Sequence, residues 1–278
     1  MKTGDVMYTI TDKEFTSISE YMRTNYGILL KPEKKTLVMG RMQNVLIEGK
    51  FNNFTSYFDY LISNKTGEAV TTLINKLTTN HTFFLREVEH FNFFRNSVLP
   101  YLISGQAVKK DLRIWSAGCS RGDEPYTLAM ILLDYFGVSK SMWDSKILAT
   151  DISTDALEKA IKGIFHRDEM TKIPKIWKMN YFHQLNAQDF QIKSIVKDEV
   201  LFRKLNLNNS SFPFQKKFHV IFCRNVMIYF DKQAKKELVN RFYELLEPGG
   251  YLFIGHSESI SREEANFKYI IPAVYRKE

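Results

Sequence analysis

The segment Leu112–Met130 (LRIWSAGCSRGDEPYTLAM) constrains the fold most, because it passes from an apolar strand through a glycine turn into an amphipathic helix. Gly118 and Gly122 flank the turn, and glycine lacks the Cβ that hinders a sharp turn and a close approach to a ligand. Asp123 and Glu124 follow at the start of the helix. This order predicts a βα unit of an α/β sheet, with the turn at the edge where such sheets bind ligands.

The acids of this turn favour a ligand that carries positive charge and hydroxyl groups. A dinucleotide site instead uses a G-x-G-x-x-G run and places a pyrophosphate on the helix N-terminus. S-adenosylmethionine has the expected chemistry, since it carries a sulfonium, an ammonium and a ribose diol and no phosphate. The same residues also suit an ordinary βα turn whose acids favour the positive end of the helix dipole. The turn by itself leaves both interpretations open.

The chain divides into a helical part and an α/β part. Before residue 80, apolar residues at helical spacing predict four helices, the first capped near Thr11 and the second beginning near Pro32. From about residue 111, strand-like apolar runs alternate with helical stretches, which is typical of a doubly wound α/β sheet. We therefore expect domains over 1–88 and 89–278, with a linking helix over 89–104.

The parallel pattern is interrupted at about 163–205, which predicts an inserted β-subdomain. Within it, QIKSIV, a polar turn at Lys197-Asp198 and EVLFRKL predict a small antiparallel hairpin. Residues 159–204 also carry ten Lys and Arg against five Asp and Glu. This basic surplus is either a solvated surface or a docking face for an acidic partner. We expect no nucleic acid there, because aromatic residues and arginines are not interleaved.

Several other classes of protein are disfavoured by the sequence. No run of about 18 apolar residues exists and the N-terminus does not resemble a signal peptide, so we expect a cytoplasmic protein without membrane insertion. The two cysteines, Cys119 and Cys223, end predicted strands and are expected to be reduced residues in tight places. The six histidines are scattered without metal-ligand spacing, so we expect no metal.

Three further positions accompany the turn. Asp151 ends the second predicted strand, where an acid can accept both hydroxyls of a ribose or simply form an Asx turn. The pair Arg224-Asn225 interrupts the apolar run VIFCRNVMIYF, so it must face something polar. We place this pair in the cleft at the strand ends. Arg86 ends the segment NHTFFLR and is either a cleft residue or a tie between the domains.

Together these segments resemble the CheR-type chemotaxis receptor methyltransferases over nearly the whole chain. The family pattern N-x-T-x-F-F-R occurs as NHTFFLR, with Leu85 in place of the second aromatic residue. SAGCSRGDEPY, ATDIS, IFCRNVMIYFD and GGYLFIGHSES match the other family motifs. The resemblance implies an all-α N-terminal domain, a doubly wound S-adenosylmethionine-dependent methyltransferase domain and a small antiparallel β-subdomain inserted in the latter.

The resemblance also implies an activity and a site. Members of this family transfer a methyl group from S-adenosylmethionine to the γ-carboxylate of chemoreceptor glutamates, giving glutamate methyl esters and S-adenosylhomocysteine. Arg86 and Tyr229 are expected beside the transferred methyl as catalytic residues. With Gly118 of the turn, the expected cofactor contacts are Asn80, Thr82, Arg86, Gly118, Glu124, Asp151, Asn206, Leu207, Arg224 and Asn225. The implied partner is the cytoplasmic helical bundle of membrane chemoreceptors, met by a monomer.

The chemistry of the implied reaction agrees with the residues present. A glutamate carboxylate has a reference pKa of about 4.3 and is ionised at neutral pH, so it needs neither a general base nor a metal to attack the methyl group. The alternative is a non-catalytic S-adenosylmethionine-binding regulatory or signalling protein. An RNA or small-molecule methyltransferase would share the sheet, since fold does not fix function. The presence of Arg86, Glu124, Asp151 and Tyr229 favours the enzyme.

Overall fold

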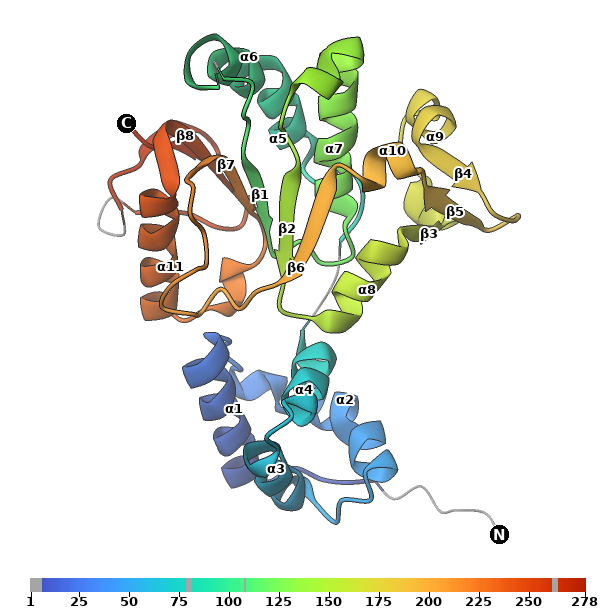
Figure 1. Cartoon of the computed structure of the whole chain (residues 1–278). Helices are drawn as coiled ribbons and strands as arrows, with labels where there is room; N and C mark the ends of the chain where they lie inside the picture. The colour runs from blue at the N-terminus through green and yellow to red at the C-terminus, as the bar shows by residue number, and fades with distance from the viewer. Residues whose placement is uncertain (1–6, 79–81, 108, 262–264) are drawn as a thin grey trace. The chain divides into compact units, whose positions relative to one another are not determined.

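The structure falls into two compact units (Figure 1). A computed structural model describes residues 7–78, 82–107, 109–261 and 265–278. The helical unit takes the N-terminal residues together with Tyr229–Ala234, and the α/β unit takes the rest. The segment 82–88, which we expected to belong to the helical domain, lies in the α/β unit. There the Arg86 carbonyl and the Glu87 side chain bind the side chain of Arg224.

The described part of the helical unit contains four α-helices, α1 (Asp12–Tyr26), α2 (Lys35–Glu48), α3 (Phe54–Ser63) and α4 (Glu68–Leu77). Thr11 and Glu14 form a capping box at the start of α1, and Gly27 ends that helix with a φ of 68°. The 3-10 turn η1 (Pro32–Lys34) leads into α2, with proline at its first position. The predicted all-α organisation of this part of the chain is confirmed.

A short segment from late in the chain packs with these helices. The backbone N–H of Leu29 donates to the carbonyl of Tyr229 at 2.8 Å, and Ile28 pairs with Phe230 in an isolated antiparallel bridge. Tyr229 itself ends the 3-10 turn η6 (Met227–Tyr229), and 38% of its surface is exposed. The helical unit is therefore completed by residues that lie some 200 positions from α1.

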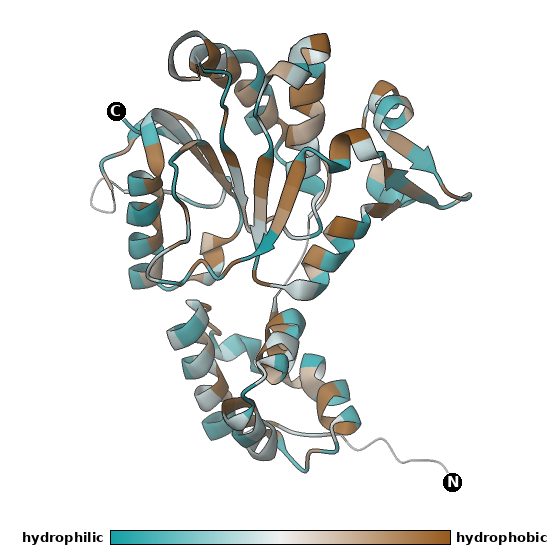
Figure 2. Cartoon of the chain, in the orientation of Figure 1, coloured by the Kyte–Doolittle hydropathy of each residue, from teal (hydrophilic) through white to brown (hydrophobic). Residues whose placement is uncertain are grey.

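The α/β unit is organised around a seven-stranded sheet in the order β6-β2-β1-β7-β8-β10-β9. Its strands are β1 (Ile114–Ala117), β2 (Ile147–Asp151), β6 (Val200–Lys204), β7 (Phe218–Cys223), β8 (Leu246–Ile254), β9 (Lys268–Ile271) and β10 (Val274–Arg276). The first five strands of that order pair in parallel, while β10 runs antiparallel to β8 and β9 runs antiparallel to β10. Each residue of β1 and β7 is buried, and Figure 2 shows hydrophobic colouring along most of β2 and β6.

Helices cover the sheet on both sides, as a doubly wound fold requires. Figure 1 shows α11 (Lys232–Leu245) on one side and α5 (Val88–Phe93) and α7 (Asp123–Phe136) on the other. The predicted linking helix is a continuous helical stretch made of α5, η2 (Phe94–Val98), α6 (Leu99–Tyr101) and η3 (Leu102–Gln106). The remaining helical elements along the sheet are η4 (Gly137–Met142) and α8 (Thr154–Lys162). No helix of the described residues has the length and apolarity needed to span a membrane.

A three-stranded antiparallel sheet forms the inserted β-subdomain, in the order β3-β5-β4. Its elements are β3 (Ile164–His166), η5 (Arg167–Met170), α9 (Lys175–Tyr181), β4 (Phe182–Gln184), β5 (Asp189–Ile192) and α10 (Ser194–Lys197). Phe165, Trp177 and Ile192 join the same hydrophobic core as α7. The indole N–H of Trp177 also donates to Asp134 of α7 at 2.6 Å. The subdomain is thus fixed to the α/β unit through both apolar and polar contacts.

The hairpin predicted within this subdomain is wrong. The segment 194–197 forms the helix α10 instead of a strand, and β6 pairs in parallel with β2 at the edge of the large sheet. The observed arrangement buries more apolar side chains than a hairpin at the surface would. The helix buries Val196 fully, and β6 packs Val200 and Phe202 against the main hydrophobic core. Short apolar runs of this kind do not distinguish helix from strand by periodicity alone.

Candidate functional site

The turn between β1 and α7 has the strained geometry that its glycines predict. Gly118 and Gly122 have φ values of 86° and 93°, and a Cβ on Gly118 would lie 2.4 Å from a methyl of Val226. The N–H groups of Gly118 and Cys119 both donate to the carbonyl of Thr150, at 2.7 and 2.9 Å. The turn is thus bound to the end of β2, and it tolerates only glycine at its first bend.

Asp151, the last residue of β2, fixes the same turn from its carboxylate. One oxygen accepts from the backbone N–H of Ser120 at 2.8 Å, and the other accepts from that of Ser153 at 2.9 Å. The Ser153 contact is the Asx turn that the sequence left as an alternative. Burial raises the pKa of Asp151, while the backbone hydrogen bonds act in the opposite direction. A carboxylate has about four lone-pair sites, so Asp151 can accept a ribose hydroxyl besides these backbone groups.

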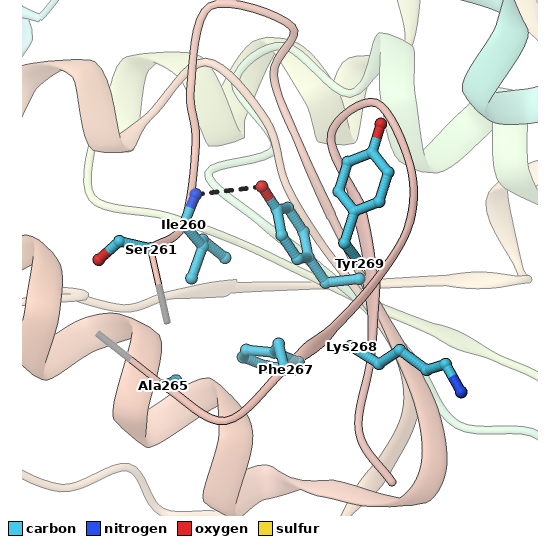
Figure 3. A pocket seen from close by; sticks show the side chains of 7 residues that line it. Ile260, Ser261, Ala265, Phe267, Lys268 and Tyr269 are labelled. Carbon is cyan, nitrogen blue, oxygen red and sulfur yellow. Dashed lines mark hydrogen bonds between the residues drawn. The ribbon is translucent and has the colours of Figure 1, made fainter. Parts of the chain in front are cut away.

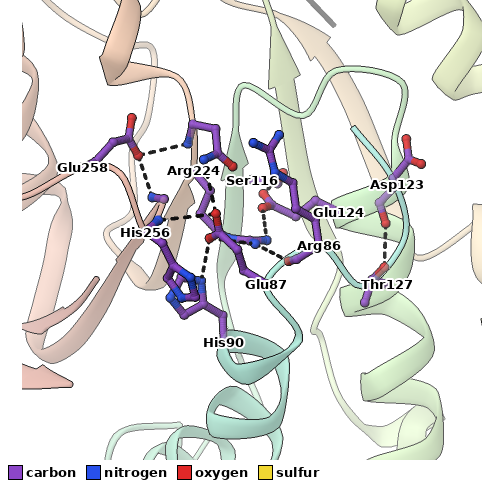
Figure 4. Close-up of polar contacts among 12 residues, drawn as sticks. Arg86, Glu87, His90, Ser116, Asp123, Glu124, Thr127, Arg224, His256 and Glu258 are labelled. Atoms are coloured by element: carbon purple, nitrogen blue, oxygen red, sulfur yellow. Dashed lines mark hydrogen bonds and ion pairs between the residues drawn. The ribbon is translucent and has the colours of Figure 1, made fainter. Parts of the chain in front are cut away.

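Glu124 and Arg224 form an ion pair at the ends of β1 and β7. One Glu124 oxygen accepts from the Ser116 hydroxyl at 2.7 Å, and the other lies 2.9 Å from a guanidinium nitrogen of Arg224. The Arg224 side chain is only 3% exposed and also pairs with Glu87 at 3.1 Å. It donates to the Arg86 carbonyl as well. The polar partner that the sequence required for Arg224 is therefore a pair of carboxylates from this same chain (Figure 4).

Glu87 connects three parts of the site, although sequence reasoning did not select it. Besides Arg224, it accepts from the Asn225 amide at 3.3 Å and from the backbone N–H of His256 at 3.4 Å. Burial opposes ionisation of this carboxyl, but Arg224 and the hydrogen bonds outweigh it and hold the pKa of Glu87 below its usual range. Glu87 therefore acts as a charged link between the segment before α5 and the ends of β7 and β8.

Glu258 is a second acid that the sequence did not reveal. Its carboxylate accepts from the backbone N–H groups of Asn225 at 3.0 Å, Ile228 at 3.2 Å and Gly255 at 2.6 Å. Burial raises the pKa of Glu258, and these hydrogen bonds favour its ionised form. The acid binds the loop after β7 to the end of β8, and it fixes the backbone on which Asn225 is held.

Left-handed backbone conformations concentrate around these contacts. Four non-glycine residues of the site have φ between 50° and 59°, namely Leu85, Glu87, Ser120 and Asn225. Such conformations persist only where surrounding contacts enforce them, and they cluster at functional sites. Here the enforcing contacts are the carboxylates of Asp151, Glu87 and Glu258.

Two buried titratable groups adjoin the network. Asp123 is fully buried, and neither of its carboxylate oxygens has a hydrogen-bond partner among the described residues. Burial raises the pKa of Asp123 to about 6. His90 is 1% exposed and lies with Nδ1 3.4 Å from a Glu87 oxygen. Burial, with Arg224 adding to its effect, lowers the pKa of His90 to about 4.

The remaining predicted residues lie at various distances from this network. Asn206 and Leu207 follow β6: the Asn206 side chain accepts from the backbone of Asn208, and the Leu207 carbonyl accepts from Arg241. The Thr82 carbonyl accepts from Arg121 at 3.4 Å. Asn80 lies outside the described residues. Tyr229 packs with the helical unit, so its role beside the methyl group stays a prediction.

Hydrogen bonds join four predicted residues, Arg86, Glu124, Arg224 and Asn225, into one network that Glu87 completes. Gly118 and Asp151 belong to a second set of hydrogen bonds, which holds the turn between β1 and α7. Glu87 and Glu258 were missed even though Glu87 directly follows the motif NHTFFLR and Glu258 stands within GHSES. Glu87 follows Arg86 directly in the sequence, and such a neighbouring pair is usually solvent-exposed. Only the fold brings Glu87 to an arginine 137 residues away.

Two further observations concern the cysteines and a pocket elsewhere in the α/β unit. Cys119 and Cys223 are both free and buried, as predicted, and burial raises the pKa of each thiol. A pocket of about 480 Å³ opens beside β9, where the Ile260 N–H donates to the Tyr275 hydroxyl (Figure 3). None of the residues lining that pocket was predicted to bind the cofactor.

Comparison with known proteins identifies the family of the chain. The family model for the CheR methyltransferase SAM binding domain matches residues 80–275, and that for the CheR methyltransferase all-alpha domain matches residues 13–78. The chain is 44% identical to a chemotaxis protein methyltransferase of Borreliella burgdorferi, over 96% of this chain and 95% of the relative. It is 35% identical to one of Escherichia coli, over 96% of this chain and 91% of the relative. The chain belongs to the CheR methyltransferase family.

Proposed function

We propose that this chain transfers the methyl group of S-adenosylmethionine to the γ-carboxylates of glutamates on chemoreceptors, giving glutamate methyl esters and S-adenosylhomocysteine. The proposal is carried by the arrangement at the carboxyl ends of β1, β2 and β7, which gathers Glu124, Asp151 and Arg224 around one strained turn. Ligands of open α/β sheets bind at this edge. Family membership and relatives named chemotaxis protein methyltransferases support the same reaction.

The donor groups of the site fit the proposed cofactor. Glu87, Glu124 and Asp151 supply three carboxylates against the two guanidinium groups of Arg86 and Arg224, and this balance suits a ligand of positive charge. The hydroxyl of Ser120 is buried beside Asp151 and has no hydrogen-bond partner among the described residues. Asp151 and Ser120 would therefore hold the ribose hydroxyls. Gly118 lets the backbone approach closely, as it would for any ligand seated on this turn.

The chain's main contribution to the reaction is alignment. S-adenosylmethionine supplies an electrophilic methyl group when it is bound, and a glutamate carboxylate with a reference pKa of about 4.3 attacks it without a general base or a metal. Correct positioning of two reactants can contribute about 7 to 11 kcal/mol to lowering a barrier. Arg86 is proposed to hold a carboxylate bidentately, and Tyr229 to orient the acceptor oxygen through its hydroxyl.

Glu124 acts on this site through Arg224. Because its carboxylate is held by Ser116 on one oxygen and by Arg224 on the other, it fixes the guanidinium as well as the edge of the cofactor site. Removing Glu124 is thus expected to disturb the segment of Arg86, whose carbonyl binds the same guanidinium. This adds a positioning role to the cofactor contact predicted for Glu124.

The proposed partner is the cytoplasmic helical bundle of membrane chemoreceptors, which the chain meets as a monomer in the cytoplasm. The basic surplus of 159–204 would dock on an acidic receptor surface. Lys159, Lys162, Lys172 and Lys175 are exposed side chains in this segment. Reversal of Lys159 and Lys162 to glutamate should lower the methylation rate on receptors at low salt, while S-adenosylhomocysteine affinity stays unchanged.

The decisive experiment is incubation of the full chain with labelled S-adenosylmethionine and receptor-enriched membranes. We expect methyl groups on receptor glutamates that are released by mild base, as esters are. Asp151→Asn serves as the variant with a damaged cofactor site. Cofactor binding by calorimetry without any transfer of label to receptors would favour the non-catalytic regulatory alternative and contradict the proposal.

A further inference from the structure

Glu87, His90 and His256 form a cluster whose two histidines have no role in the proposed methyl transfer. One ligand atom from each residue lies within 4.8 Å of the ligand atoms of the other two. Figure 4 shows their side chains converging where α5 meets the end of β8. Two imidazoles and one carboxylate are a recurring ligand set of zinc centres, with water in the fourth position. The scattered spacing of these residues in sequence hid the cluster.

The spacing within the cluster suits two ligands of one metal ion. The distance from Nδ1 of His90 to the Glu87 oxygen is 3.4 Å. Hydrogen bonds between nitrogen and oxygen usually span about 2.7–3.2 Å. Two ligands bound to one tetrahedral zinc ion at about 2.0–2.1 Å lie about 3.4 Å from each other. These two residues therefore already stand at the separation that a zinc ion imposes.

The burial of His90 points to the same conclusion. The side chain is 1% exposed, and neither ring nitrogen has a hydrogen-bond partner of ordinary geometry among the described residues. The backbone carbonyl of Pro272 faces the ring. Metal-binding histidines commonly give one nitrogen's proton to a backbone carbonyl and offer the other nitrogen to the metal. Without a metal, the ring nitrogen that faces Glu87 stays without a hydrogen bond of ordinary geometry.

The surrounding charges and access also permit a cation. Arg224 lies 3.1 Å from Glu87, but its other side pairs with Glu124 at 2.9 Å, so one positive charge is shared by two carboxylates. His256 is exposed, which gives an ion a path from solvent and leaves room for a water ligand.

We propose that Glu87, His90 and His256 form a binding site for a divalent transition-metal ion, with zinc as the best fit and water as the fourth ligand. Imidazole and carboxylate ligands also accept cobalt, which occupies tetrahedral sites in place of zinc. The site does not depend on the proposed methyl transfer. The experiment measures metal binding and not methyl transfer. A negative result would therefore contradict the metal site without bearing on the proposed enzymatic activity.

The test is a titration of the chelator-treated full chain with zinc, followed by calorimetry and by competition with a chromophoric chelator. His256→Ala removes an exposed ligand without opening the core. His183→Ala removes an exposed histidine of β4 outside the cluster and is the matched control. We expect one equivalent bound, an affinity at least about tenfold weaker in His256→Ala and unchanged in His183→Ala.

Visible absorption of bound cobalt is a second measurement, because this absorption becomes intense when cobalt is tetrahedrally coordinated. We expect this absorption in the unmodified chain and in His183→Ala, and a much weaker band in His256→Ala. Tryptophan fluorescence in urea would verify that both variants remain folded. The absence of zinc binding at micromolar concentrations, or equal binding by the two variants, would overturn the proposal.

Discussion

Replacing Arg224 by methionine tests the central network most directly. The guanidinium is 3% exposed and is bound by the carboxylates of Glu124 and Glu87 and by the Arg86 carbonyl. Methionine keeps much of the apolar volume but leaves both carboxylates without their positive partner. Breaking a buried ion pair from one side costs about 3–5 kcal/mol, because the charge that stays behind is uncompensated. We expect the free energy of unfolding of the α/β unit to fall by that amount.

Tryptophan fluorescence during urea denaturation isolates this unit. All three tryptophans of the chain, Trp115, Trp143 and Trp177, lie in the α/β unit, so the signal reports its unfolding and not that of the helical unit. The matched control is Lys268→Met, which breaks an exposed pair with Glu278 and should leave the free energy of unfolding nearly unchanged.

A compensated variant separates charge from packing. Arg224→Met combined with Glu87→Gln and Glu124→Gln removes the stranded charges, and it should recover at least half of the lost stability. A loss below about 1 kcal/mol in Arg224→Met would show that the pair behaves like a surface pair. A combined variant no more stable than the single one would equally refute the reasoning.

Three further predictions concern the turn and its neighbours. The pKa of Asp123 rises on folding from 3.8 to about 6, so its ionisation destabilises the fold increasingly as pH rises through this range. Asp123→Asn should therefore add up to roughly 3 kcal/mol of stability at pH 8 and nothing below about pH 4, as measured by urea denaturation at each pH; a gain independent of pH would contradict this cause. Asp151→Asn should weaken S-adenosylhomocysteine binding at least about tenfold in calorimetry, because one of its two oxygens becomes a donor, and unchanged affinity would remove Asp151 from the site. Gly118→Ala should lower the free energy of unfolding by more than about 1 kcal/mol, since the φ of Gly118 is 86° and Val226 occupies the space of the added methyl group. The control is Gly105→Ala, whose added Cβ meets nothing within 4 Å and should change the free energy of unfolding little. Equal effects of the two substitutions in urea denaturation would show that the bend at Gly118 tolerates a side chain.

The parts of the site that could be predicted from sequence are those in which local chemistry and position coincide. Gly118 and Asp151 stand at strand ends, where the βα pattern places a ligand edge, and the fold needs no distant information to put them there. The requirement that Arg224 meet polar partners also followed from its apolar surroundings. The identity of those partners did not, because it depends on which carboxylates the sheet order brings to β7.

The failures have the same origin in long-range packing. Glu87 reads as a solvated acid before a helix, yet it bridges Arg224, Asn225 and His256. The segment after β5 is short and apolar, so its pattern fits both the helical and the strand periodicity. The helix forms because it buries Val196 in the core. His90 and His256 are separated by most of the α/β unit, so no spacing rule connects them.

The path of the backbone limits how this protein can be dissected. Because Tyr229–Ala234 completes the helical unit, the polypeptide crosses between the two units three times, and no single cut separates them. A fragment ending at residue 78 would lose the acceptor of the Leu29 amide and the bridge partner of Ile28. Domains are usually separated by truncation at a linker that few contacts cross. Truncation after residue 78 would instead remove the segment Tyr229–Ala234 from the helical unit. An isolated helical unit would therefore need the segment Tyr229–Ala234 fused to it through a linker.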